Sequence, residues 1–145
     1  MKINNDLISS KSILINSSPE KVWDVLTNPT IINKYLYGAE TITDWKVDSK
    51  ISFVIKFDEQ TFVDKGIVIE NNQNELLEYK YWSGFCGLED RPENYSIVTY
   101  KLEKIDNITI QFTWQQRGFA NEESRKNSEN ALLTILEQIK LHSEK

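Results

Sequence analysis

Cys86 and His142 are the only cysteine and the only histidine in the sequence, which makes them the first candidates for nucleophilic catalysis. A cysteine or serine nucleophile needs a base within hydrogen-bonding distance. His142 lies close to the C-terminal end, where chains commonly fray, so a Cys-His or Ser-His site would require unrelated segments to meet by chance. We therefore expect no catalytic residues, and we interpret Cys86 as an incidental loop thiol rather than a redox centre.

Other polar residues also fail to form a recognisable reactive group. No set of histidine, cysteine, aspartate and glutamate residues has metal-ligand spacing, so we expect neither a metal site nor a cofactor. No tuned acid–base pair is recognisable. Asp64 and Lys65 are interpreted as solvated edge residues, whereas Gln116, near the end of a predicted strand, is a candidate for a polar contact. The sequence thus favours binding over catalysis, although an enzyme that acts by positioning its substrate stays open.

Aromatic residues are the stronger candidates for a site, because they make up 11% of the chain and many are predicted to face the interior. Aromatic pockets with a few polar groups are a common form of small-molecule site. The same residues could instead fill an ordinary β-rich core. Buried tyrosine hydroxyls need partners, which a ligand or water could supply. The predicted ligand-binding residues are Phe53, Phe57, Tyr79, Tyr81, Tyr100, Phe112, Trp114, Leu132 and Leu136.

The loop from Ser83 to Asn94 is longer than a usual hairpin loop of about 2–5 residues. Long loops often act as lids over binding sites. Phe85 and Leu88 are apolar residues on this otherwise polar loop, so they could cap a cavity. The alternative is that they pack on a neighbouring loop or on a second subunit.

These candidates must be positioned by the surrounding elements, and the N-terminal ones are well marked. Residues 6–15 are rich in β-branched side chains and predict a strand. A helix follows, for which Ser17 or Ser18 is the cap, with Ser17 and Glu20 at capping-box spacing. Asn28-Pro29 ends this helix, and Pro29 can open a second short helix over residues 29–36.

Five further segments alternate between apolar and polar residues, which is typical of an antiparallel sheet with one covered face. They span residues 50–57, 61–70, 75–82, 95–104 and 107–119. In the first, the inner face is predicted to hold Ile51, Phe53, Ile55 and Phe57. In the last, it is predicted to hold Ile108, Ile110, Phe112 and Trp114.

Apolar residues at helical spacing predict one long helix from about Asn121 to about His142. They are Leu132, Ile135, Leu136 and Ile139. Some 20 helical residues extend roughly 30 Å, longer than a seven-residue strand of about 23 Å. A strongly twisted sheet curls, and this helix is the element suited to fill its concave face.

The composition excludes several classes of partner. We expect the 145 residues, 1–145, to form a single domain. The net charge is −5 and no basic run occurs, which argues against nucleic acid and anionic membranes. No apolar stretch approaches the roughly 20 residues of a membrane span, and the N-terminal residues lack the apolar segment of a signal peptide. One cysteine excludes an internal disulfide framework, so we expect a cytoplasmic protein.

The order of these segments resembles the helix-grip or START-like superfamily, also called SRPBCC. The details are most similar to its branch named after the activator of the heat-shock-protein-90 ATPase. That branch has a Pro-Glu-x-Val-Trp helix, a Thr-x-Pro break, a Gly-x-Val strand, a Leu-x-Tyr-x-aromatic strand and a final Gly-Phe. The matching residues are Pro19, Glu20, Val22, Trp23, Thr27, Pro29, Gly66, Val68, Leu77, Tyr79, Tyr81, Gly118 and Phe119. The Gly-Trp that often opens the branch's terminal helix is absent here.

The resemblance implies an α+β, birch-pollen-allergen-like fold. In this fold a curved antiparallel sheet of six or seven strands wraps around the C-terminal helix, and two short helices follow the first strand. The short helices brace the open end of the sheet, with Trp23 as an apolar wedge between them and the sheet. Trp23 is therefore interpreted as structural rather than ligand-binding.

Three functions are compatible with these observations. The leading hypothesis is non-enzymatic binding of a small hydrophobic or amphipathic molecule between the sheet and the C-terminal helix, because an aromatic inner face occurs without catalytic groups. The resemblance implies two alternatives. One is a chaperone-associated protein-interaction module with a role in stress response, and the other is a cyclase-like enzyme for polyketide-type substrates. The oligomeric state stays open between monomer and homodimer.

Overall fold

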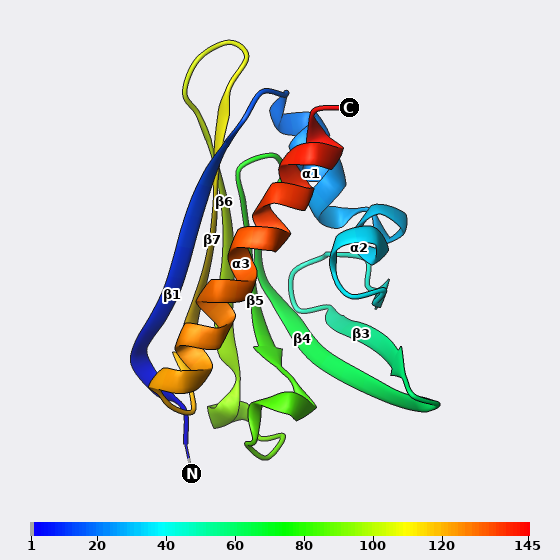
Figure 1. The fold of residues 1–145 in the computed structure, drawn as a ribbon, viewed down its shortest axis with the longest axis vertical. Coiled ribbons are helices and arrows are strands. Elements are labelled where there is room, and N and C mark those ends of the chain that lie inside the picture. Colours follow the sequence, from blue (N-terminus) through cyan, green and yellow to red (C-terminus); the bar gives the residue numbers. More distant parts are fainter. Residues whose placement is uncertain (1) are drawn as a thin grey trace.

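The computed structural model describes residues 2–145, and Figure 1 shows their arrangement as a curved sheet with one long helix across it. The strands are β1 (Asn4–Ile15), β2 (Glu40–Ile42), β3 (Lys50–Phe57), β4 (Gln60–Asn72), β5 (Leu76–Trp82), β6 (Ser96–Lys104) and β7 (Ile110–Phe119). The helices are α1 (Pro19–Thr27), α2 (Pro29–Tyr35) and α3 (Glu122–Ser143), with 3₁₀ turns η1 (Gly84–Cys86) and η2 (Pro92–Asn94). The expected curved sheet, long C-terminal helix and two short helices after the first strand are confirmed.

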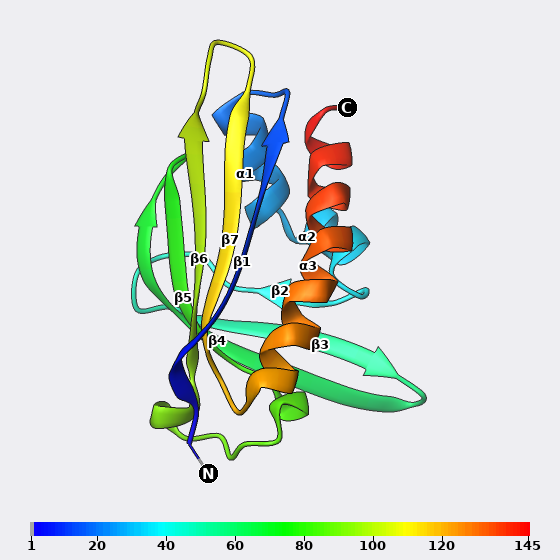
Figure 2. The same cartoon turned by 60° about the vertical axis from the view of Figure 1, so that its left-hand side comes forward.

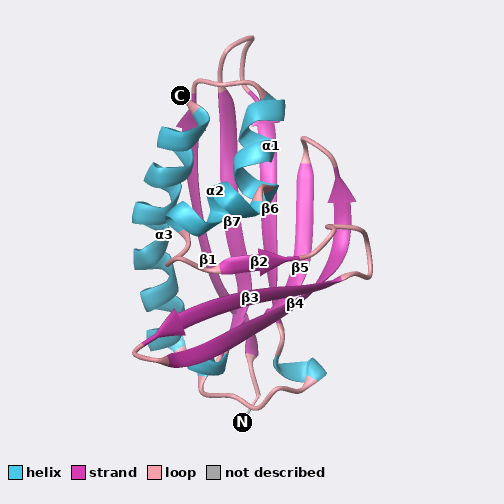
Figure 3. Cartoon of the chain, turned by 90° about the vertical axis from the view of Figure 1, so that its right-hand side faces the viewer, coloured by secondary structure: helices cyan, strands magenta, loops and turns pink. Residues whose placement is uncertain are grey.

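The sheet has seven strands in the order β1-β7-β6-β5-β4-β3-β2, and every described pair is antiparallel. The sheet curls strongly, as Figure 3 shows: β3 and the first part of β4 run at a steep angle to β6 and β7. Gly66 lies in β4, where a Cβ would come within 2.7 Å of the backbone oxygen of Lys80, so only glycine allows this close approach. The β4–β5 register shifts between Val68 and Glu70, an irregularity that increases local twist.

One asparagine joins the two short helices. The backbone N–H of Asn28 donates to the Asp24 carbonyl (2.8 Å) at the end of α1, and its side-chain oxygen accepts from Thr30 N (3.0 Å) at the start of α2. At the other end of α1, Ser18 is the cap and accepts from Lys21 N at 3.2 Å. The capping box expected from Ser17 is wrong, because the helix begins one residue too late for it.

Replacing Asn28 by alanine should lower the free energy of unfolding by about 1 kcal/mol, because the Thr30 N–H loses its acceptor. Urea titration followed by circular dichroism would measure the change. Asn107→Ala, at an exposed position in the β6–β7 turn, is the matched control and should shift stability far less. Equal stability of the two variants would contradict the capping role.

The two short helices close one end of the sheet. Trp23 is buried there with 7% of its surface exposed and belongs to the hydrophobic core, in agreement with the expected structural role. The Tyr35 hydroxyl donates to the Val25 carbonyl at 2.9 Å, which ties α2 to α1. The indole N–H of Trp45 donates to the Thr27 carbonyl, also at 2.9 Å, and so fixes the segment that follows β2. This end of the molecule is therefore filled by side chains.

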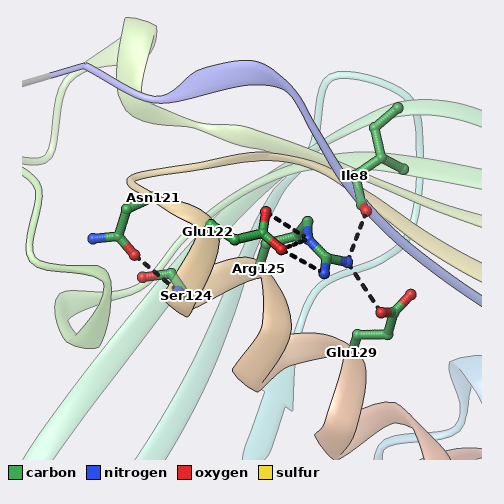
Figure 4. Close-up of polar contacts among 6 residues, drawn as sticks. All are labelled: Ile8, Asn121, Glu122, Ser124, Arg125 and Glu129. Atoms are coloured by element: carbon green, nitrogen blue, oxygen red, sulfur yellow. Dashed lines mark hydrogen bonds and ion pairs between the residues drawn. The ribbon is translucent and has the colours of Figure 1, made fainter.

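Helix α3 is attached to β1 near both of its ends, and the two elements lie side by side in Figures 1 and 2. At its start, Arg125 pairs with Glu122 (2.7 Å) and Glu129 (3.0 Å) and donates to the Ile8 carbonyl at 3.4 Å (Figure 4). Near its end, Lys140 donates to the Leu14 carbonyl at 3.0 Å. These contacts hold the helix in place while leaving its middle free to face the sheet.

At the ends of strands, one inward prediction is wrong and a second holds for the face of the side chain but not for its burial. Ile108 is 70% exposed, because β7 begins only at Ile110 and Ile108 belongs to the preceding turn. Phe57 does lie on the predicted face, but it is 66% exposed, because it is at the tip of the β3–β4 hairpin, beyond the part of the sheet that the core covers. Period-two alternation predicts on which face of the sheet a side chain lies. It does not predict where along the strand that face is no longer covered by other residues.

Candidate functional site: a cavity between the sheet and α3

A cavity of about 680 Å³ lies between the concave face of the sheet and the N-terminal half of α3. Its helix wall runs from Ser124 to Ile135. Beyond this, α3 buries Leu136 and Ile139, and α1 packs against it, so the interior is filled on that side. The sheet wall comes from β3, β4, β5, β6 and β7, and the β3–β4 hairpin reaches toward the same half of the helix (Figures 2 and 3).

The structure brings six of the nine predicted site residues together around this cavity. They are Phe53, Phe57, Tyr79, Tyr81, Trp114 and Leu132. The other three, Tyr100, Phe112 and Leu136, are buried core residues that do not line it. The predicted inner face continues past the cavity into the part of the sheet that α1 covers, and sequence alternation cannot mark that boundary.

Edge-to-face and tilted contacts fix the aromatic wall. Phe53 lies 6.2 Å from Tyr79 and 6.0 Å from Tyr81, measured between ring centroids. Tyr100 lies behind this wall, 4.5 Å from Trp114 and 5.6 Å from Tyr79. Such pairs add to the stability that burial provides. The wall is therefore a packed, preformed surface.

The tyrosine hydroxyls of this wall find partners within the protein. Those of Tyr79 and Tyr100 share a hydrogen bond of 2.8 Å. The Tyr81 hydroxyl donates to Asp64 Oδ2 at 2.6 Å. Burial raises the pKa of each of these three tyrosines, and the Asp64 charge raises the pKa of Tyr81 further. All three therefore stay protonated at neutral pH, and no ligand is needed to satisfy them.

Asp64 lines the cavity with only 5% of its surface exposed, so its interpretation as a solvated edge residue is wrong. It shares the inner face of β4 with Gly66 and Val68, two residues further along each time. This alternation could have placed Asp64 on the inner face from the sequence alone, but its charge suggested an exposed position instead. Lys65 does point outward, where it pairs with Asp90 at 2.7 Å.

Further polar groups line the cavity, one on β7 beside Trp114 and three on α3 opposite the aromatic wall. Gln116, the candidate for a polar contact, lines it and donates to Ser96 Oγ at 3.0 Å. Ser124, Asn127 and Ser128 of α3 also line it and were missed by sequence reasoning. Their spacing of three or four residues places them on the helix face that continues to Leu132 and Ile135, which is the signal that identifies them.

The loop from Ser83 to Asn94 reaches the cavity with only one of its two apolar residues. Phe85 is 65% exposed, lines the cavity and contacts the Phe62 ring at 4.7 Å between centroids. Leu88 is buried elsewhere, beside a small separate cavity of about 50 Å³. The lid therefore stays a prediction for Phe85, and Leu88 acts as the anchor of the loop.

No cluster of three or more histidine, cysteine, aspartate or glutamate side chains suited to a metal ion occurs within residues 2–145. None of the helices described in that range is both long and apolar enough to cross a membrane. Cys86 lines the cavity, whereas His142 lies in the last turn of α3, at the opposite end of a 22-residue helix about 33 Å long. The helix thus separates His142 from the Cys86 thiol.

A curved antiparallel sheet that encloses a cavity against a long C-terminal helix defines a helix-grip, START-like protein. Within this class, the sequence model described as "Activator of Hsp90 ATPase homolog 1-like protein" matches residues 16–144. The chain belongs to this family, and the resemblance inferred from its motifs is confirmed.

Solved structures show the same fold. The solution structure of ChR145 from Cytophaga hutchinsonii is 34% identical, with a TM-score of 0.80 over 97% of this chain and 94% of that one. An Aha1 dimer from Colwellia psychrerythraea is 17% identical (TM-score 0.74, coverage 94% and 96%). An HSP90 activator from Plasmodium falciparum is 15% identical (TM-score 0.73, coverage 93% and 94%). No curated protein matches the sequence significantly.

Proposed function

We propose that the protein binds a small hydrophobic or amphipathic molecule in the cavity between the sheet and α3. The observation that carries this proposal is the cavity itself, about 680 Å³ in volume and lined by an aromatic wall. Small-molecule sites are commonly clefts of roughly 300–1,000 Å³ with mainly apolar linings and a few convergent polar groups. Asp64, Tyr81 and Gln116 are polar groups of this kind.

The entrance supports the same proposal. Phe57 and Phe85 are large apolar residues exposed by 66% and 65%, and both line the cavity at its solvent side. Exposed apolar side chains are costly to hydrate and often mark the edge of a binding site. A ligand that enters beside them would pass to Trp114 and Leu132, which are buried. The interior of the cavity is therefore complementary to the apolar part of a ligand, and its rim to a part that stays partly solvated.

The test is a titration with N-phenyl-1-naphthylamine, a neutral aromatic dye whose fluorescence rises in apolar surroundings. We expect a saturable rise, together with backbone-amide NMR shifts at Tyr79, Trp114 and Leu132. Residues 105–107 in the β6–β7 turn are internal references and should not shift, since neither they nor their chain neighbours line the cavity. A linear, non-saturable response, or shifts spread over the outer face, would overturn the proposal.

A second candidate is a chaperone-associated protein-interaction module. It is favoured by the family to which the chain belongs and by the fold it shares with the Plasmodium falciparum activator. The test is to measure the ATPase rate of a heat-shock-protein-90 chaperone with and without this protein. Saturable stimulation would support an activator role. An unchanged rate, with no complex detected by sedimentation, would exclude it and leave the ligand-binding proposal intact.

A further inference from the structure

One buried carboxylate oxygen in the cavity wall has no hydrogen-bond donor. Asp64 Oδ2 accepts from Tyr81, but Asp64 Oδ1 is buried and receives no hydrogen bond from any of residues 2–145. The ion pairs formed within those residues also leave Asp64 out. A buried charged oxygen without a hydrogen-bond donor is energetically unfavourable. A donor that bonds to it therefore gains more free energy than a donor that bonds to an exposed carboxylate oxygen.

We infer that Asp64 anchors a hydrogen-bond-donating group of the bound molecule, through Oδ1. This inference rests on the proposed binding function and specifies the chemistry of the ligand. The donor is a hydroxyl or an amine N–H, carried by an apolar body that lies against Phe53, Tyr79 and Trp114. A carboxylate head group at this position would be repelled by Asp64.

The surrounding contacts orient the carboxylate for this role. Tyr81 holds Oδ2 at 2.6 Å, and its raised pKa keeps it a neutral donor at physiological pH. This bond restricts rotation of the Asp64 side chain, so Oδ1 has a defined position before a ligand arrives. A preformed acceptor loses little conformational freedom on binding, which favours selectivity for the donor group. Lys65, the adjacent cation in β4, is paired with Asp90 on the outer side and does not compete.

The experiment compares two probes that differ only in hydrogen-bond donation, 2-naphthol and 2-methoxynaphthalene, by NMR titration at neutral pH. Both present the same aromatic body, but only the naphthol has an O–H. We expect the wild-type protein to bind 2-naphthol about tenfold more tightly, the size of effect that a hydrogen bond to a charged group produces.

Substitutions assign the preference to Asp64. In Asp64→Asn the amide oxygen can keep the Tyr81 bond, which turns the NH₂ group toward the position of Oδ1. The preference for 2-naphthol should then disappear or reverse, and retained binding of 2-methoxynaphthalene would show that the cavity is intact. Asp6→Asn, the same change at an exposed position on β1, is the matched control and should keep the preference. Tyr81→Phe should weaken it, because Asp64 loses the hydrogen bond that fixes the position of Oδ1.

The outcomes separate this inference from the proposed function. A tenfold preference that Asp64→Asn removes and Asp6→Asn retains would support it. Equal binding of both probes by the wild-type protein would overturn the role of Asp64 while leaving the cavity a binding site. A preference that persists in Asp64→Asn would also overturn it. Failure of both probes to bind would overturn the proposed function and the inference together.

Discussion

Replacing Ala131 by tryptophan should weaken the binding of N-phenyl-1-naphthylamine by about a hundredfold. Ala131 is a small residue on the helix wall of the cavity, one turn from Ile135. An indole at this position would occupy the space between α3 and the sheet and displace part of the probe. Loss of the burial of one aromatic ring costs up to about 3 kcal/mol, and each 1.4 kcal/mol changes affinity about tenfold. Fluorescence titration measures the effect.

The matched control is Leu133→Trp, two residues further along the same helix, where the native side chain is 54% exposed to solvent. It adds the same indole to the outer face of α3 and should leave the affinity unchanged. Thermal denaturation should show both variants folded, since the new side chain at position 131 enters empty space rather than a filled core. Wild-type affinity in a folded Ala131→Trp variant would mean that the probe binds elsewhere.

Replacing Trp23 by alanine should lower the free energy of unfolding by about 3–5 kcal/mol, the usual cost of removing a core tryptophan. Trp23 is 93% buried, by difference from its 7% exposed surface, and joins α1 to the hydrophobic core. Its removal would leave a void at the filled end of the molecule, away from the cavity. Guanidinium denaturation would measure the lost free energy of unfolding. A variant that no longer folds would correspond to the upper end of the expected loss.

Phe57→Ala provides the comparison for Trp23, because it also removes an aromatic ring but from a position that is 66% exposed. Its effect on stability should be within about 0.5 kcal/mol. If the two variants lost similar stability, Trp23 would not be the wedge that its burial indicates. Since Trp23 does not line the cavity, a folded Trp23→Ala variant should still bind the dye.

Most of the fold could be predicted from local patterns, because each element carries its own signal. The alternating segments became β3 to β7, and the apolar spacing near the C-terminus became α3. Pro29 after Asn28 marked the break between α1 and α2. The short strand β2 was not predicted, because its three residues owe their pairing to β3 rather than to their own pattern.

The site was predicted less completely, because a cavity depends on which inward residues lack neighbours. Tyr100 and Phe112 have the same sequence pattern as Tyr79 and Trp114, but only the latter pair lines the cavity. Asp64 was misplaced because charge normally indicates solvent exposure. Its burial is explained by the Tyr81 hydroxyl, which comes from the neighbouring strand and cannot be paired with it by local sequence alone.

The pairing of β1 with β7 has a consequence for how the chain acquires its structure. Among the strands described within residues 2–145, β7 is the only neighbour of β1, and the contact between Ser12 and Thr113 joins residues 101 positions apart. During synthesis β1 leaves the ribosome well before β7, so it must stay unpaired until nearly the entire sheet has been made. Helix α3, which also packs on β1, emerges later still. Closure of the fold therefore waits for β7 and α3, and the synthesis of these two segments determines when β1 becomes protected.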